Sequence, residues 1–101
     1  MEVFWITFRL ANNATYDARY QALIDAVQLH HHGDWWFEPT SFWLIASNSS
    51  RAVIAASIAR AITKTTDLVL LGSMEYTGAT LIGKASELAT LRKLVPTLVT
   101  V

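Results

Sequence analysis

Three long runs of β-branched, aliphatic and aromatic residues alternate with two segments of helical periodicity, and this alternation limits the folds open to the chain. The runs cover residues 3–8, 41–46 and 67–72. Their nearly continuous apolar character is typical of central strands with both faces covered. A shorter run, residues 35–38, precedes the second. Pro39 separates these two, which predicts either a hairpin or one long strand with a bend, because proline cannot donate to a strand ladder.

The two helical segments show apolar residues at the spacing of one helix face. The first carries them at Tyr16, Tyr20, Leu23, Ile24 and Val27, and the second at Val53, Ile54, Ile58, Ala61 and Ile62. Asn13 or Thr15 is suited to cap the first helix, and the polar cluster 47–50 to cap the second. Gly33 suits the left-handed backbone position that follows a helix.

The resulting order is strand–helix–strand–strand–helix–strand, which predicts two split βαβ units. Right-handed crossovers would place both helices on one face of a four-stranded antiparallel sheet. We therefore expect an α+β, ferredoxin-like βαββαβ fold in a single domain, with a core over residues 2–73. The remaining residues, 74–101, are expected to form a C-terminal strand and helix extension, with a short strand at 80–82, a helix that begins near Ser86 and ends before Pro96, and an edge strand at 97–101.

Such a sheet would leave one face bare, although its strands are rich in aromatic residues. Either a second copy of the chain or the C-terminal segment could cover this face. We expect a homodimer in which the sheets pack together. The predicted interface residues are Trp5, Trp35, Phe37 and Trp43.

The composition excludes several classes of protein. Eight basic residues balance eight acidic ones among the 101 residues, which disfavours a strongly electrostatic nucleic-acid binder and leaves nucleic acid as a weaker alternative partner. There are no cysteines, so disulfide scaffolds and thiol chemistry are excluded. No apolar stretch reaches the roughly 18–20 residues that span a bilayer, and the N-terminus does not read as a signal peptide. We expect a cytoplasmic domain without membrane partners.

The tract 33–45, GDWWFEPTSFWLI, resembles the second and third strands of the small CRISPR-associated adaptation nucleases, and most closely their SinR-like bacterial relatives. The resemblance covers roughly residues 3–72. It implies a ferredoxin-like homodimer, with a metal-binding Asp at the end of the first strand. Arg9 occupies that position here. Because a divalent cation requires carboxylate oxygens, we expect no metal or other cofactor and no residue in a catalytic role.

Arg9 is also the centre of a predicted anion site. A strand-end Arg beside amide side chains and a helix N-terminus is suited to a phosphate or carboxylate. The predicted ligand-binding residues are Arg9, Asn12, Asn13 and Tyr76. The cluster of His30, His31 and His32 with Asp34 contains possible metal ligands, but consecutive residues on a helix point about 100° apart. A solvated helix C-terminus explains these histidines better.

Three functions follow from these residues. The preferred one is a non-catalytic homodimeric module with an interaction or regulatory role. The first alternative is a metal-dependent endonuclease acting on RNA or DNA with other carboxylates, such as Glu38 or Glu75. The second alternative is a domain that binds a small anionic ligand near Arg9 and Tyr76.

Overall fold

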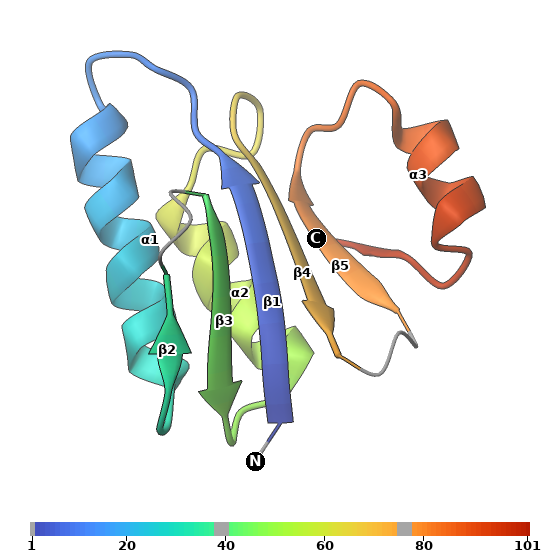
Figure 1. Ribbon diagram of the computed structural model, residues 1–101. Helices are drawn as coiled ribbons and strands as arrows, with labels where there is room; N and C mark the ends of the chain where they lie inside the picture. Colours follow the sequence, from blue (N-terminus) through green and yellow to red (C-terminus); the bar gives the residue numbers. More distant parts are fainter. Residues whose placement is uncertain (1, 38–40, 75–77) are drawn as a thin grey trace.

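The structure of the chain is a computed structural model that describes residues 2–37, 41–74 and 78–101. These residues form a single sheet of six strands and three helices that pack against it (Figure 1). In chain order the elements are β1 (Glu2–Arg9), α1 (Tyr16–His30), β2 (Trp35–Trp36), β3 (Phe42–Ser47), α2 (Arg51–Ala61), β4 (Leu68–Ser73), β5 (Ala79–Gly83), α3 (Leu88–Leu94) and β6 (Val99–Thr100).

The strands follow the order β2-β3-β1-β4-β5-β6 across the sheet. All neighbouring pairs are antiparallel except β5 and β6, which are parallel. The prediction of a four-stranded antiparallel ferredoxin-like sheet is therefore wrong, since the sheet is mixed and has six strands. The difference arises in the C-terminal segment. β5 supplies the hydrogen-bonding partner that β4 would otherwise lack at an exposed edge, and the chain then returns through α3 to add β6.

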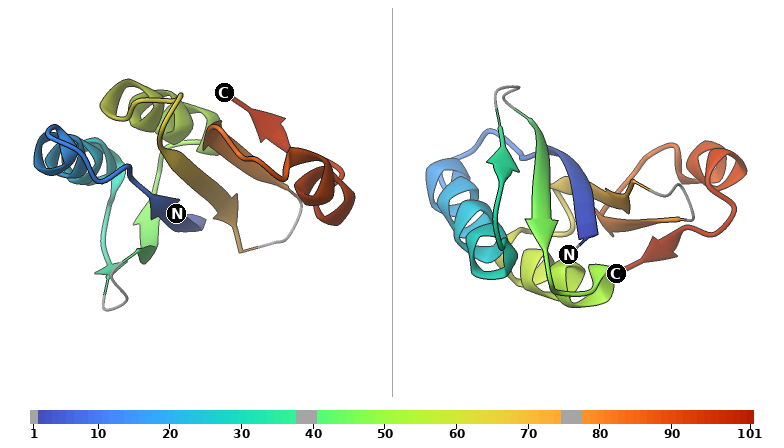
Figure 2. Two further views of the ribbon diagram at one scale, coloured as in Figure 1. Left: turned by 90° about the horizontal axis from the view of Figure 1, so that it is seen from above. Right: turned by 60° about the horizontal axis from the view of Figure 1, so that its bottom comes forward.

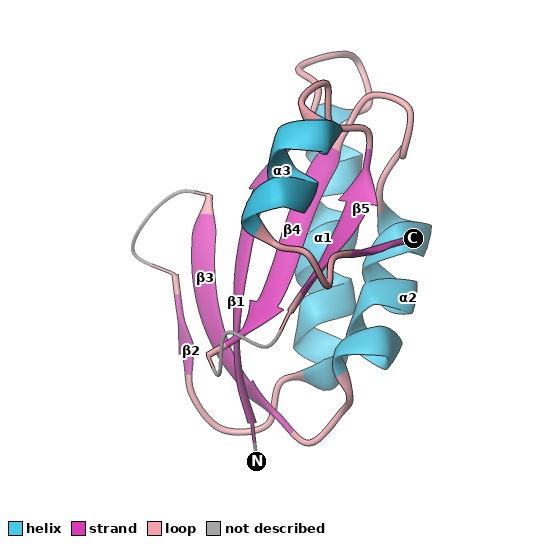
Figure 3. Cartoon of the chain, turned by 90° about the vertical axis from the view of Figure 1, so that its right-hand side faces the viewer, coloured by secondary structure: helices cyan, strands magenta, loops and turns pink. Residues whose placement is uncertain are grey.

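Helices α1 and α2 lie on one face of the sheet, whereas α3 lies on the other (Figures 2 and 3). The main core fills the space between the sheet and the first two helices. Its largest fully buried side chains include Phe4, Ile6, Leu23, Ile45 and Ile58. Period-2 alternation along β1 explains this arrangement, because its even-numbered residues face the helices and its odd-numbered residues face the opposite side.

The helix boundaries follow local capping chemistry. Ser50 is the N-cap of α2, and its hydroxyl accepts a hydrogen bond from the Val53 amide at 3.2 Å. Thr15 occupies the N-cap position of α1 without a side-chain capping bond. Instead, Asn13 Oδ1 accepts from the Thr15 amide at 3.1 Å. Gly33 has a φ of 105° just after α1, as its position predicts.

A smaller apolar cluster packs on the other face of the sheet, beneath α3. Its buried residues are Ala79, Leu81 and Leu98. Leu88, Leu91 and Val95 pack against them from α3 and the segment that follows it. The C-terminal segment thus covers the β4–β5 half of this face, which was one of the two covers expected from the sequence. No helix in the described part of the chain is long and apolar enough to cross a membrane.

Trp43 provides a test of the main core. Its indole is 2% exposed and lies 4.7 Å from the ring of Phe8 and 6.5 Å from that of Tyr20, measured between centroids. We expect Trp43→Ala to lower the free energy of unfolding by about 3–5 kcal/mol, because the lost contacts leave a cavity. Urea denaturation followed by circular dichroism measures this change.

The matched control is Trp36→Ala, since the Trp36 side chain is 44% exposed. We expect it to cost much less than Trp43→Ala. A loss below about 1 kcal/mol for Trp43→Ala would contradict the burial of this ring.

Candidate functional site

Of the four residues predicted to bind an anion, the three that the structure describes lie in different surroundings. Arg9 ends β1, is exposed, and lines a shallow groove on the α3 side of the sheet together with Glu87 and Leu70. Asn12 is exposed in the following loop. Asn13 instead faces α1, where its Oδ1 accepts from Arg19 Nη2 at 2.7 Å. Tyr76, like Glu38 and Glu75, lies outside the described residues.

The strongest electrostatic feature is a buried ion pair between Arg19 and Asp67. Arg19 Nη1 donates to both carboxylate oxygens of Asp67, at 2.6 and 2.7 Å. The carboxylate also accepts from the backbone amides of Ala11 at 2.8 Å and Thr63 at 2.9 Å. Asp67 is fully buried and Arg19 is 7% exposed. The carboxylate is therefore saturated by groups of the protein itself.

The guanidinium of Arg19 also finds hydrogen-bond acceptors within the protein. Its Nη2 donates to the carbonyl of Ala11 at 2.7 Å as well as to Asn13, and its Nε donates to Thr15 Oγ1 at 3.0 Å. This network joins α1 to the loops that follow β1 and α2. It explains why Asn13 serves the fold rather than an external anion.

The surroundings of Asp67 shift its acidity. Burial by itself raises the pKa of the carboxyl group, because it disfavours the charged form. The amides of Ala11 and Thr63 and the guanidinium of Arg19 oppose burial and prevail, so the pKa of Asp67 lies below its ordinary value of 3.8. The folded protein therefore binds this proton less tightly than the unfolded chain does.

The three histidines have separate partners. His30 lies between two hydroxyls, with Nδ1 3.0 Å from Ser49 Oγ and Nε2 2.6 Å from Ser57 Oγ. The ring of His31 packs against Trp35 at a centroid distance of 5.1 Å. His32 Nδ1 accepts from the Asn48 amide at 3.1 Å. Among the described residues no group of three His, Asp or Glu side chains could hold a metal ion. Through these contacts, the histidines hold the C-terminal end of α1 against β2, α2 and the loop that precedes α2.

The predicted interface residues are divided between the two faces of the sheet. Trp43 pairs with Ile6 and lies in the core on the helix side, so it presents almost no surface to a second copy. Trp35 also packs on the helix side, in a T-shaped contact with Trp43 at 5.5 Å. Phe37 is 65% exposed next to β2. Trp5 lies on the opposite face of the sheet.

No helix or strand of the described residues covers the apolar side chains on the β2-β3-β1 half of the face that carries α3. Figure 1 shows no helix or strand in front of these three strands. The register places side chains of β1 and β3 next to one another here, including Trp5 with Leu44 and Thr7 with Phe42. Trp36, which belongs to β2, lies opposite Leu44 of β3. We call this surface the open face; it consists of Val3, Trp5, Thr7, Trp36, Phe42 and Leu44.

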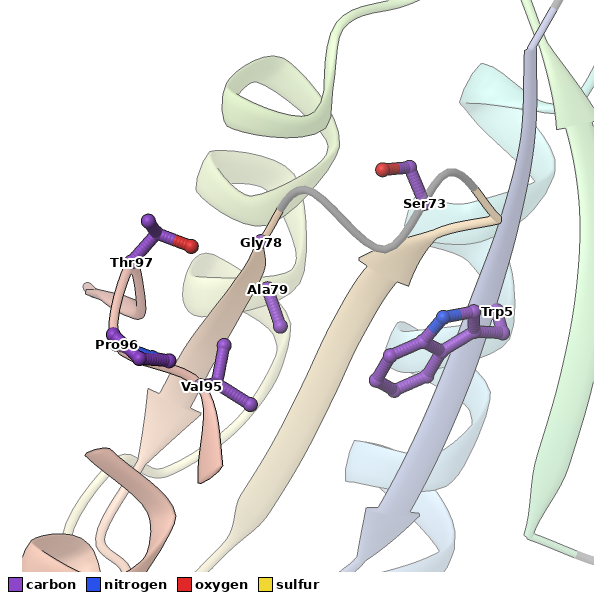
Figure 4. A pocket seen from close by; sticks show the side chains of 7 residues that line it. All are labelled: Trp5, Ser73, Gly78, Ala79, Val95, Pro96 and Thr97. Atoms are coloured by element: carbon purple, nitrogen blue, oxygen red, sulfur yellow. The ribbon is translucent and has the colours of Figure 1, made fainter. Parts of the chain in front are cut away.

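Beside the open face, Trp5 forms one wall of a cavity beneath the C-terminal segment. The cavity has a volume of about 180 Å³ and is lined by Trp5, Ser73, Gly78, Ala79, Val95, Pro96 and Thr97. Figure 4 shows the indole reaching across β4 toward Ala79 and Val95 on the far wall. Gly72 makes this possible, because a Cβ atom there would lie only 2.2 Å from Cζ2 of the indole. Trp5 therefore borders two surfaces at once.

The Arg19–Asp67 pair is the main feature that sequence reasoning missed. A signal was present, because Arg19 lies three residues after Tyr16 and four before Leu23. It therefore falls on the apolar face of α1, where a charged residue requires a buried partner. The identity of that partner depends on how the loop before β4 meets α1, and residue spacing does not define this.

Comparison with protein-family models, with curated proteins and with solved structures finds no match for this chain.

The ion pair predicts a pH-dependent stability. A carboxyl group whose pKa is lower in the folded than in the unfolded protein contributes stability above its ordinary pKa, and this contribution disappears as the pH falls through the folded value. We expect the free energy of unfolding to fall as the pH is lowered from about 5 to about 2. We expect Asp67→Asn to cost about 3–5 kcal/mol at neutral pH, because it leaves Arg19 buried without a counter-charge.

Urea unfolding at several pH values measures both effects. The Asp67→Asn variant should show a shallower loss of stability in acid than the wild type. Asp25→Asn is the control, because Asp25 is exposed and, within the described residues, its Oδ1 accepts from the Gln21 side chain of the same helix. An equal acid response in wild type and Asp67→Asn would contradict the assigned role of Asp67.

Proposed function

We propose that the chain is a non-catalytic homodimeric module that acts in the cytoplasm, and that two copies associate through the open face. The observation that carries this proposal is that α3 covers only half of one side of the sheet. The other half exposes Val3 at 41% and Trp36 at 44%, with Phe42 and Leu44 partly exposed between them. A contiguous apolar surface of this kind is typical of a protein interface.

The charges of the chain are compatible with a second copy binding to this surface. An interface around a two-fold axis must be complementary to itself, because the same patch contributes both sides. The chain has no net charge, so two copies do not repel each other. Arg9 and Glu87 line the groove next to the open face, which gives its border both signs of charge. Two sheets can then pack face to face at the usual spacing of about 10 Å.

The same charges do not favour nucleic acid as the main partner. A nucleic-acid surface combines aromatic side chains with an excess of Lys and Arg. The open face provides aromatic rings, but Arg9 beside it is balanced by Glu87. This balance supports an apolar protein contact.

The non-catalytic part of the proposal is supported by the charged groups near the end of β1. The first strand ends in the cation Arg9, where the resemblance to adaptation nucleases implies a metal-binding Asp. The buried carboxylate of Asp67 is already occupied by Arg19 and two backbone amides. Its saturated hydrogen bonds leave it unsuited to hold a cation.

Sedimentation velocity and light scattering at micromolar concentration test the proposal. We expect a species of twice the chain mass of 11.2 kDa. Leu44→Lys should convert it to a monomer, because the substitution places an ammonium group in the middle of the apolar contact. Circular dichroism should show that the variant remains folded.

Leu29→Lys is the matched control, since Leu29 is 71% exposed on α1, on the far side of the molecule. This variant should remain a dimer. A wild-type monomer would overturn the proposal, as would a Leu44→Lys variant that associates as strongly as the wild type.

A further inference from the structure

We propose that the cavity beside Trp5 is a binding site for a small, neutral aromatic molecule that carries a hydrogen-bond acceptor. This site is distinct from the open face, although Trp5 borders both. It lies between the sheet and the chain that follows α3, with Trp5 on one side and Ala79, Val95 and Pro96 on the other (Figure 4).

The size and lining of the cavity indicate the kind of ligand. An apolar cavity of about 150 Å³ is known to accommodate a benzene ring, and the cavity beside Trp5 measures about 180 Å³. Its side chains come from one aromatic, several aliphatic and two hydroxyl residues. No charged side chain lines it among the described residues. Because these described side chains offer no counter-charge to a charged ligand, the proposed ligand is neutral.

Trp5 is held as a flat wall for such a ring. Gly72 lies on the neighbouring strand, directly opposite Trp5 in the register. Because Gly72 has no side chain, the indole lies against the backbone of β4, and even one added carbon atom would collide with it. The ring system is therefore fixed on one side and presents the cavity with a surface suited to offset stacking or an edge contact.

One polar group at this wall, the indole N–H of Trp5, defines the acceptor. This N–H makes no hydrogen bond with any described residue, whereas Ser73 lies opposite Phe4 in the register and its hydroxyl points away from the indole (Figure 4). An indole N–H can only donate. A ligand with a carbonyl or ether oxygen on its ring supplies an acceptor for this N–H.

Acetophenone and ethylbenzene are the probes for this site, because they share one ring and differ in the carbonyl group. Two-dimensional ¹H–¹⁵N NMR resolves the indole N–H signals, and Trp5→Phe identifies the signal of Trp5. We expect acetophenone at millimolar concentration to shift this signal while leaving that of the buried Trp43 unchanged. Ethylbenzene should bind about fivefold more weakly, the effect of one neutral hydrogen bond.

Ala79→Leu is the variant that closes the cavity, because Ala79 is 2% exposed and its side chain points into it. We expect this variant to lose the response to acetophenone at least tenfold while its melting temperature is unchanged or higher, since the added methyl groups fill empty space. Ala89→Leu makes the same change at an exposed position of α3 and should bind normally. If Ala79→Leu does not fold, Val95→Phe closes the cavity from the partly exposed C-terminal segment.

The titration is repeated on Leu44→Lys, which separates this proposal from the proposed dimer. Leu44 does not line the cavity, so the monomeric variant should bind acetophenone with the affinity of the wild type. An unshifted Trp5 signal in the wild type would overturn the site, whatever the state of association. An undiminished response in the folded cavity-closing variant would overturn it too. Equal affinity for the two probes would overturn the assigned hydrogen bond.

Discussion

The buried ion pair between Arg19 and Asp67 determines how the helical layer is attached to the sheet. Arg19 belongs to α1, and Asp67 immediately precedes β4. The same carboxylate receives the amide of Ala11 after β1 and that of Thr63 after α2. One charged group therefore holds four segments that are distant in the sequence. Removal of either charge alone would leave the other buried and unpaired, so the two residues can be exchanged for apolar ones only together.

Gly72 has a corresponding role on the other side of the sheet. Its missing side chain lets the indole of Trp5 lie across β4, which places the ring between the open face and the cavity under the C-terminal segment. A larger residue at this position would displace the indole from both surfaces. The absence of a side chain at Gly72 therefore defines the shape of the molecular surface on this face of the sheet.

The sequence predicts where helices and strands lie along the chain better than it predicts how they pack against one another. The spacing of Leu23 and Val27 locates the buried face of α1, and both residues are fully buried. The face on which an aromatic residue lies depends on strand register, which composition does not reveal. Trp43 is opposite Ile6, and Trp5 is one residue before Ile6, so the two indoles lie on opposite faces. For the same reason, the sequence shows β5 and β6 as short apolar runs, but it does not show that β5 lies beside β4 and β6 beside β5.

The size of α3 explains why the open face exists. A helix with its side chains is about 10 Å wide, and neighbouring strands are about 4.8 Å apart, so one helix covers about two strands. On one side of the sheet α1 and α2 together cover the central strands, whereas on the other side only the seven-residue α3 is present, above β4 and β5. In the described part of the chain, the strands β1, β3 and β2 then lack a covering helix on that side. The chain has no further helix among its described residues to supply it, and a second sheet of the same apolar character is the partner whose shape matches a flat strand surface.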